Sequence, residues 1–311
     1  MANEFSGFQE YVFFAPETTW GVTPGTPVYI YLPYAAYDVT AKPQAIQPAL
    51  FTGLYERRDS RITRTGLDGN LSLPIFGYQV ANKSIAQYLI DLAITRTTPI
   101  YPPSFLIEQS ESGVDNKRHN GLRVSTLTLS GDNDSNSEIQ IALGLIGGTE
   151  TGGITPQTIP VTSPQPVGFL FADATLTVGG VATPMRSFSL SIKNNLQAKF
   201  TNSQWATIVH AGVREVDFTF TVFKNANTFD LLARLTGSSN TTMTLLLKGL
   251  HLGTGPSGTT FSTVQIDFAR ASFMNLSNTK ALNDLVQQSP SYVVLKPDSA
   301  LDEIVLTYGA S

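Results

Sequence analysis

The chain has 311 residues, of which 41% are hydrophobic and only 14% charged, and its net charge is −4. Soluble domains average about 25% charged residues, so uncharged polar side chains must cover much of this surface. The absence of cysteine excludes disulfides and thiolate metal sites, and the acidic balance argues against a protein that grips nucleic acid through its phosphates. With neither a signal-peptide pattern nor a long apolar run, we expect a soluble product made without export.

Strand-like segments recur along the chain. In five of them, apolar residues alternate with polar ones, or β-branched and aromatic residues predominate. Such patterns are typical of half-buried strands, so the sequence predicts a mainly β fold. The five segments are residues 28–32, 71–73, 124–129, 188–192 and 216–222.

Three stretches have helical character, at residues 82–95, 225–235 and 278–286. The first two each follow a strand directly, carry an asparagine near a plausible N-cap position and repeat apolar residues at helical spacing. We therefore expect each of these two helices to lie across a sheet.

Aligning the two helices reveals a longer correspondence between the halves of the chain. Strand, long loop, strand, helix, strand and strand follow one another in both halves, although few residues are identical. Residues 14–17, 37–42 and 66–67 match residues 171–174, 188–193 and 212–213, and the strands near Phe105 and Val124 match those near Leu245 and Val264.

This order of elements indicates an internal duplication. The predicted domains are residues 1–155 and 156–311, and the join lies within residues 147–166, where glycine, threonine and proline replace the alternating pattern. The alternative is two unrelated β domains.

No motif for catalysis or for a cofactor stands out. His119, His210 and His251 lie in separate segments without metal-ligand spacing, and we expect them on the surface or in loops. Residues 253–258 fit the G-x-G-x-x-G pattern but open no helix, which favours a hairpin loop. Residues 132–136 resemble the start of a calcium loop but lack its later glycine and glutamate, which favours a turn between strands. We expect no enzymatic activity, no metal and no cofactor.

The N-terminal segment carries a resemblance to a known family. Residues 16–27 read Pro-Glu-Thr-Thr-Trp-Gly-Val-Thr-Pro-Gly-Thr-Pro and precede an aromatic strand. Arg57-Arg58, the turn at residues 65–69 and the strand at residues 121–127 follow in order. Together they resemble the major tail tube proteins of long-tailed, siphovirus-like bacteriophages, directly over the first half and through the repeat over the second.

The resemblance implies a small β-sandwich with one flanking helix, whose strands join those of neighbours in a closed ring around a DNA channel. Two tandem domains of this kind would let three chains supply a ring with pseudo-sixfold symmetry. The implied partners are further copies of the chain, the tape measure protein and viral DNA in the lumen, and the tail terminator and tail-tip proteins, with no membrane. The implied locations are the virion tail and, during assembly, the host cytoplasm.

Two sets of residues are expected to carry this function. In the resembled family a long loop reaches the adjacent ring; here the loops would be residues 43–64 and 194–210, which are too long for tight turns. A lumen that lets DNA slide should repel phosphates mildly. The inter-ring candidates are Phe51, Tyr55, Arg57, Arg58 and Trp205, and the lumen-facing candidates are Asp68, Glu215, Asp217 and Asp267.

Three alternatives stay open. The chain could be a tail-tip or hub protein built from paired tube domains. It could form hexameric rings and use its second half as an outer decoration. A carbohydrate-binding or carbohydrate-cleaving β protein is a third alternative, although two tryptophans and no aromatic cluster beside carboxylates offer it little support.

Overall fold

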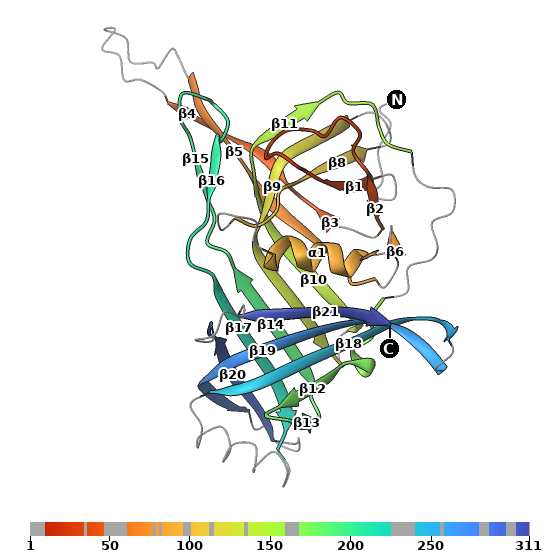
Figure 1. The fold of residues 1–311 in the computed structure, drawn as a ribbon. Helices are drawn as coiled ribbons and strands as arrows, with labels where there is room; N and C mark the ends of the chain where they lie inside the picture. The colour runs from red at the N-terminus through yellow and green to blue at the C-terminus, as the bar shows by residue number, and fades with distance from the viewer. Residues whose placement is uncertain are drawn as a thin grey trace, which may run out of the picture.

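Strands dominate the structure, a computed structural model (Figure 1). The described part holds one α-helix, α1 (Ile85–Ile94), and a single 3-10 turn, η2 (Phe171–Asp173). The predicted mainly β fold class is therefore confirmed. The structure describes residues 10–33, 36–46, 61–76, 79–80, 83–95, 101–111, 115–133, 136–158, 168–224, 240–255, 258–279, 286–296 and 303–310.

Eight antiparallel strands form one continuous series through the molecule. Each strand pairs with the next through backbone hydrogen bonds, and β3 (Ala36–Tyr37) also pairs with the second strand. The order is β4 (Thr40–Ile46), β5 (Arg61–Pro74), β10 (Asn136–Gly147), β9 (Asp115–Asp132), β14 (Ser187–Lys193), β17 (Glu215–Phe223), β20 (Gln287–Val294) and β19 (Gly258–Thr279).

Two smaller groups of strands flank this series, one in each half of the chain. Two short hairpins form separate two-stranded sheets. In one, β6 (Gln79–Val80) pairs with β7 (Lys83–Ser84), and in the other, β15 (Gln197–Lys199) pairs with β16 (Ile208–His210). The first group runs β2 (Ile30–Leu32), β1 (Glu10–Pro16), β8 (Phe105–Glu111), the first part of β9 and β11 (Thr149–Gly152); the second runs β13 (Val181–Thr183), β12 (Thr175–Val178), β18 (Thr241–Gly255), the first part of β19 and β21 (Ile304–Ala310).

β9 and β19 each belong to a flanking group and to the eight-strand series. Pairing of β9 with β8 extends to Leu122, and pairing with β10 begins at Arg123. β19 changes partner in the same way, from β18 to β20, at Ala271. A strand shared in this manner ties two sheets together at a corner.

The pairing registers of β9 and β19 break at matching points. Ser125 is skipped opposite β10, and Met274 is skipped opposite β20. A second break lies beside Leu122 in β9 and beside Ala271 in β19. Because bulges occupy specific positions, these breaks fix which residues of the two halves correspond. Following the strand pairs outward, Lys42 corresponds to Lys193, Asp68 to Asp217, Thr40 to Ser191, and Thr128 to Ser277.

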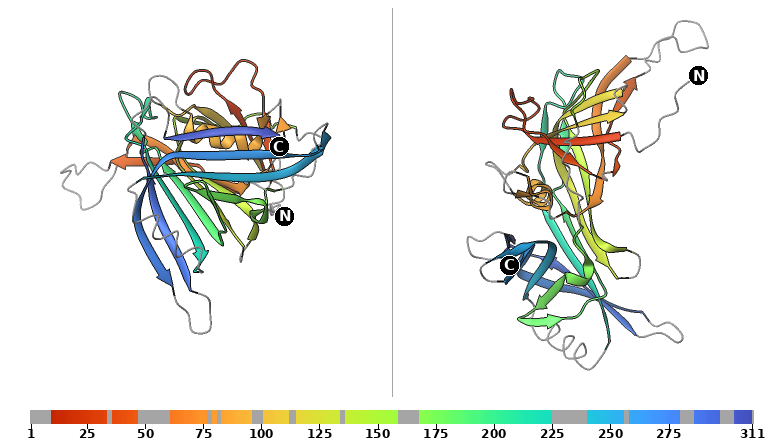
Figure 2. Two further views of the ribbon diagram at one scale, coloured as in Figure 1. Left: turned by 60° about the horizontal axis from the view of Figure 1, so that its bottom comes forward. Right: turned by 90° about the vertical axis from the view of Figure 1, so that its right-hand side faces the viewer.

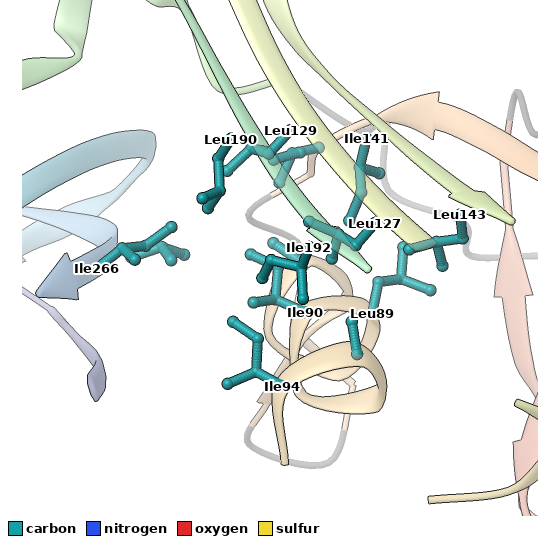
Figure 3. Packing of buried hydrophobic residues seen from close by; sticks show 14 of the residues in the cluster. Leu89, Ile90, Ile94, Leu127, Leu129, Ile141, Leu143, Leu190, Ile192 and Ile266 are labelled. Carbon is teal, nitrogen blue, oxygen red and sulfur yellow. The ribbon is translucent and has the colours of Figure 1, made fainter. Parts of the chain in front are cut away.

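The helix α1 covers one side of the eight-strand series (Figure 2, right), and the hydrophobic core lies between them. Alternate residues of β14 and β17 are buried, as period-two strands with one covered face require. Leu89 and Ile90 of α1 face Leu127 of β9 and Ile192 of β14, so the helix spans the contact between these strands (Figure 3). Burial of one such side chain stabilises the fold by roughly 1.5–3 kcal/mol.

The strand pairing corrects parts of the sequence alignment of the halves. Phe14 lies in β1, whereas Phe171 begins the turn η2, so these two do not correspond. Leu67 takes the place of Val216 rather than Val213. The expected match of Phe105 and Val124 with Leu245 and Val264 is also wrong in register, because Val124 corresponds to Phe273 and Phe105 to Thr241. Only the match of residues 37–42 with 188–193 agrees with the pairing.

The local predictions have mixed outcomes. The first helix is confirmed at Ile85–Ile94, shorter than predicted, while the second, at residues 225–235, lies outside the described residues. The third is wrong at its start, since residues 278 and 279 end β19, and residues 280–285 are not described. The hairpin predicted at residues 253–258 connects β18 and β19, and the turn near residues 132–136 connects β9 and β10, as expected.

Candidate functional site

One face of the eight-strand series, opposite the core, carries mainly small polar side chains. We call it the open face. Its residues pair across neighbouring strands, are exposed or half-buried, and seldom carry charge. The polar members are Asn70, Ser72, Thr126, Thr128, Ser130, Ser187, Ser189, Ser191, Thr219, Thr221, Asn275, Ser277, Ser289 and Ser291.

Two lysines offset carboxylates on this face. The Lys42 Nζ atom lies 2.6 Å from Asp68 Oδ2. In the corresponding place of the second half, Lys193 Nζ lies 3.7 Å from Asp217 Oδ2 and 4.0 Å from Glu215 Oε2. Exposed ion pairs of this kind add little stability, about 0–1 kcal/mol. Their main effect is to balance charge on the open face.

The open face includes three of the four acidic residues predicted to face the lumen. Asp68, Glu215 and Asp217 belong to it. Asp267 does not, because it lies in the first part of β19, opposite Val305 of β21. Its carboxylate there accepts a hydrogen bond from Thr244 Oγ1 at 2.7 Å.

The residues predicted to contact the adjacent ring are described only in part. Phe51, Tyr55, Arg57 and Arg58 lie outside the described residues. Trp205 is half-buried and forms a parallel bridge with Thr65 of β5. The neighbouring Gln204 carbonyl accepts a hydrogen bond from the Thr65 backbone N–H at 2.6 Å. The second long loop therefore lies along β5 of the first half.

The halves of the chain meet where β9 pairs with β14, which we call the seam. Facing residues run from Ser187 opposite Asp132 to Lys193 opposite Thr126. Ladder hydrogen bonds across the seam make the four strands of each half continuous with those of the other. A core on one side and the open face on the other therefore both extend across the seam.

Polar side chains of the second half bind the end of α1 beside the seam. Asn194, 3% exposed, donates from Nδ2 to the carbonyls of Ala93 and Val124, both at 3.0 Å. Arg214 donates to Asn194 Oδ1 at 3.0 Å and to the Ile94 carbonyl at 2.7 Å. Since α1 has no basic residue in its last turn, the Arg214 guanidinium supplies the positive charge that a helix C-terminus favours.

The eight-strand series ends in two edge strands. Within the described residues, β4 pairs only with β5, and the last part of β19, Phe273 to Thr279, pairs only with β20. These strands correspond to β14 and β9, which pair with each other at the seam. Pro43 on β4 is typical of an edge strand, because proline has no backbone N–H to offer a neighbour.

A buried polar cluster was not predicted. The prediction that His119 lies on the surface or in a loop is wrong, because this residue is 0% exposed within β9. Its Nδ1 atom lies 2.7 Å from the Tyr37 hydroxyl, and its Nε2 atom 3.1 Å from Glu150 Oε2. Burial lowers the pKa of His119, although the Glu150 carboxylate opposes that shift. These partners come from β3 and β11, so no local pattern could have indicated them.

His210 and His251 belong to β16 and β18. Among the residues that the structure describes, no group of histidine and carboxylate side chains could hold a metal ion. The described part of the chain also contains no helix long and apolar enough to cross a membrane.

The sequence matches a known protein family over most of its length. Residues 7–269 match the protein family described as phage tail tube protein. No curated protein matches the chain. The family match covers most of the eight-strand series and both sides of the seam. The chain therefore belongs to the phage tail tube protein family.

Proposed function

We propose that three copies of this chain close into a ring and that such rings stack into the tail tube of a virion. The seam carries the proposal, because it joins a four-strand unit of the first half edge to edge with one of the second half. The free ends of the series correspond to the strands that meet at the seam. A chain with such ends can repeat the contact with further copies, and closure leaves no open edge.

Each half of the chain, residues 1–155 and 156–311, would then be one tube domain that arose by duplication. The matching strand order and the matching bulges at Ser125 and Met274 support this division. Because every chain contributes two domains, three chains would give a ring with pseudo-sixfold symmetry.

The open face would line the lumen of the tube. A wall of serine, threonine and asparagine with offset charges at Lys42 and Lys193 offers phosphates few cationic contacts. Each such contact would add salt-sensitive affinity and slow the passage of DNA. The lumen would hold the tape measure protein during assembly and viral DNA during ejection.

Cryo-electron microscopy of tubes assembled from the purified chain tests this function. The expected map has three chains in each ring and a threefold axis. A ring of six chains would contradict the proposal, and would make the second half an outer decoration. Filaments that lack closed rings would contradict it as well.

The long loop at residues 43–64 would reach the next ring. Its described flanks, β4 and β5, form a hairpin that extends beyond the last β5–β10 pair. Deletion of residues 49–56 should leave a folded chain, checked by circular dichroism, that no longer forms stacked tubes. Normal tubes from the deleted chain would exclude this role.

A further inference from the structure

The pairing of β9 with β14 inside the chain indicates the partner of each free edge. β9 corresponds to β19 and β14 to β4, and β9 pairs with β14 inside the chain. At the seam, Thr128 faces Ser191. Their counterparts in the other half are Ser277 and Thr40.

We propose that β4 of one chain pairs antiparallel with the last part of β19 of a second copy, in the register of the seam. Thr40 then lies opposite Ser277, and Lys42 opposite Asn275. This inference rests on the proposed function, and it adds the partner strands and their register to it.

The faces of the two edges agree with this register. Thr40, Lys42, Asn275 and Ser277 are all exposed, and the pairing would place them together on the open face. Residues that alternate with them turn toward the core.

Ala41 and Leu276 are such core-side residues, and both are only half-buried in the single chain. Their counterparts at the seam, Ile192 and Leu127, face each other and are 0% exposed. Pairing of the edges would cover Ala41 and Leu276 in the same way, and burial of apolar surface favours association.

The interchain contact differs from the seam at the bulge. Within the seam, the backbone N–H of Asn194 donates to the Ser125 carbonyl at 2.7 Å. Asn194 corresponds to Pro43, which has no N–H, so the interchain contact lacks this hydrogen bond. Ser125 corresponds to Met274, whose side chain is 63% exposed in the single chain. Met274 of one copy packs against Pro43 of the next, and an apolar contact replaces the hydrogen bond.

The charged groups beside the seam also have no counterpart at the interchain contact. The Arg123 Nη1 atom donates to the Val209 carbonyl of the second half at 3.1 Å. Arg214 corresponds to Thr65 and Arg123 to Ser272, and neither Thr65 nor Ser272 can donate as a guanidinium does. The ring therefore alternates between two kinds of contact. The seam inside a chain adds hydrogen bonds from the Asn194 and Arg214 side chains to its strand ladder and apolar packing, whereas contacts between chains are held by the strand ladder and apolar packing alone.

Engineered disulfides test the register, because the chain contains no cysteine. The double variant Thr40→Cys/Ser277→Cys places two thiols in a facing pair between chains. Oxidised tubes of this variant should run as covalent dimers and trimers on a non-reducing gel. The matched control, Thr128→Cys/Ser191→Cys, has the corresponding facing pair inside one chain. Its disulfide should form within the monomer and give no covalent dimers or trimers.

Two further variants detect a slipped register. Thr40→Cys/Asn275→Cys and Thr40→Cys/Thr279→Cys move the partner by two residues and keep it on the same face. Both should give far fewer cross-links than Thr40→Cys/Ser277→Cys. Preferred cross-linking of either one would overturn the register, while a ring of three chains by electron microscopy would leave the proposed function standing. Rings of three in which none of the three pairs cross-links would overturn the choice of partner strands. Rings of six would instead remove the proposed function.

The Met274 contact has a separate test. Met274→Ser should raise the protein concentration needed for tube formation by about tenfold or more. Its matched control is Val305→Ala, which truncates an exposed apolar side chain of β21 away from both edges and should assemble like the parent. Circular dichroism of the unassembled variants should show that both are folded. Assembly of Met274→Ser at the parent's concentration would exclude the Met274 contact.

Discussion

The indole Nε1 of Trp20 donates a hydrogen bond to the carbonyl of Gly121 at 3.0 Å. The Glu17 carboxylate accepts a hydrogen bond from the Gly121 backbone N–H at 2.8 Å and another from the Gly21 N–H at 3.0 Å. Gly121 lies in β9 just before the strand passes from the flanking group into the eight-strand series. The Pro-Glu-Thr-Thr-Trp-Gly segment therefore fixes the corner that brings β9 to the seam.

Substitution of Gly121 by alanine should destabilise the chain. Gly121 has a φ of +69°, and a Cβ atom there would lie 3.1 Å from the Trp20 ring. The left-handed conformation alone costs a non-glycine residue roughly 1–2 kcal/mol. The free energy of unfolding, measured with urea on unassembled protein, should fall by at least about that amount. In contrast, Gly152→Ala, where a Cβ would have no neighbour within 4 Å, should change it by less than about 0.5 kcal/mol.

Arg214→Ala should loosen the C-terminal end of α1. The substitution removes hydrogen bonds to Asn194 and to the Ile94 carbonyl, and with them the positive charge at the helix end. Loss of partners for buried polar groups costs about 1–3 kcal/mol. Hydrogen exchange in α1 should become faster, and the free energy of unfolding should fall. Arg61→Ala, at an exposed arginine of β5, is the matched control; equal effects of the two substitutions would exclude this role of Arg214.

His119 should make stability depend on pH. Burial lowers its pKa in the folded chain, with Tyr37, Glu150 and Lys117 as the facing groups. As pH falls below about 6.5, the usual histidine pKa, the unfolded chain takes up a proton before the folded chain does. The stability contributed by neutral His119 is thus complete above that pH and is lost as pH falls through the lowered pKa.

Comparison of variants isolates this contribution. Relative to His119→Gln, the free energy of unfolding of the parent should fall as pH drops from about 6.5 through the lowered pKa of His119. His210→Gln, at an exposed histidine of β16, should keep the pH profile of the parent. A parallel profile for His119→Gln and the parent would show that His119 does not titrate on unfolding.

Local patterns predicted the kinds of element but not their partners. Strand segments such as residues 188–192 and 216–222 follow from period-two alternation, which depends on neighbouring residues alone. Alternation does not specify which strand pairs with which, or in what register. The alignment of Leu67 and Val124 with the second half failed for this reason. The bulges that fix the correspondence arise from pairing and leave no mark in the sequence pattern.

The candidate surfaces were predictable to a similar extent. The shortage of charge in the composition indicated a surface of mainly uncharged polar side chains, and most side chains of the open face are of this kind. Three predicted acidic residues lie on it because they alternate with buried residues of β5 and β17. Asp267 alternates in the same way within β19, but that part of the strand belongs to the flanking group. A strand shared between two sheets cannot be divided by its sequence.

Thiol labelling before and after assembly identifies which face of the series is enclosed. If the open face lines the tube, a thiol at Ser189→Cys should react with a large maleimide-polyethylene glycol in the unassembled chain but not in tubes. The polymer is excluded because a closed barrel admits it only from its ends, whereas a small maleimide enters and should label both states. Thr307→Cys, at an exposed position of β21 in the flanking group, should react with both reagents before and after assembly. The proportion of modified chain on a denaturing gel measures each case. Equal protection of the two thiols would point to general burial on assembly, and protection of Thr307→Cys alone would place the flanking group on the lumen side.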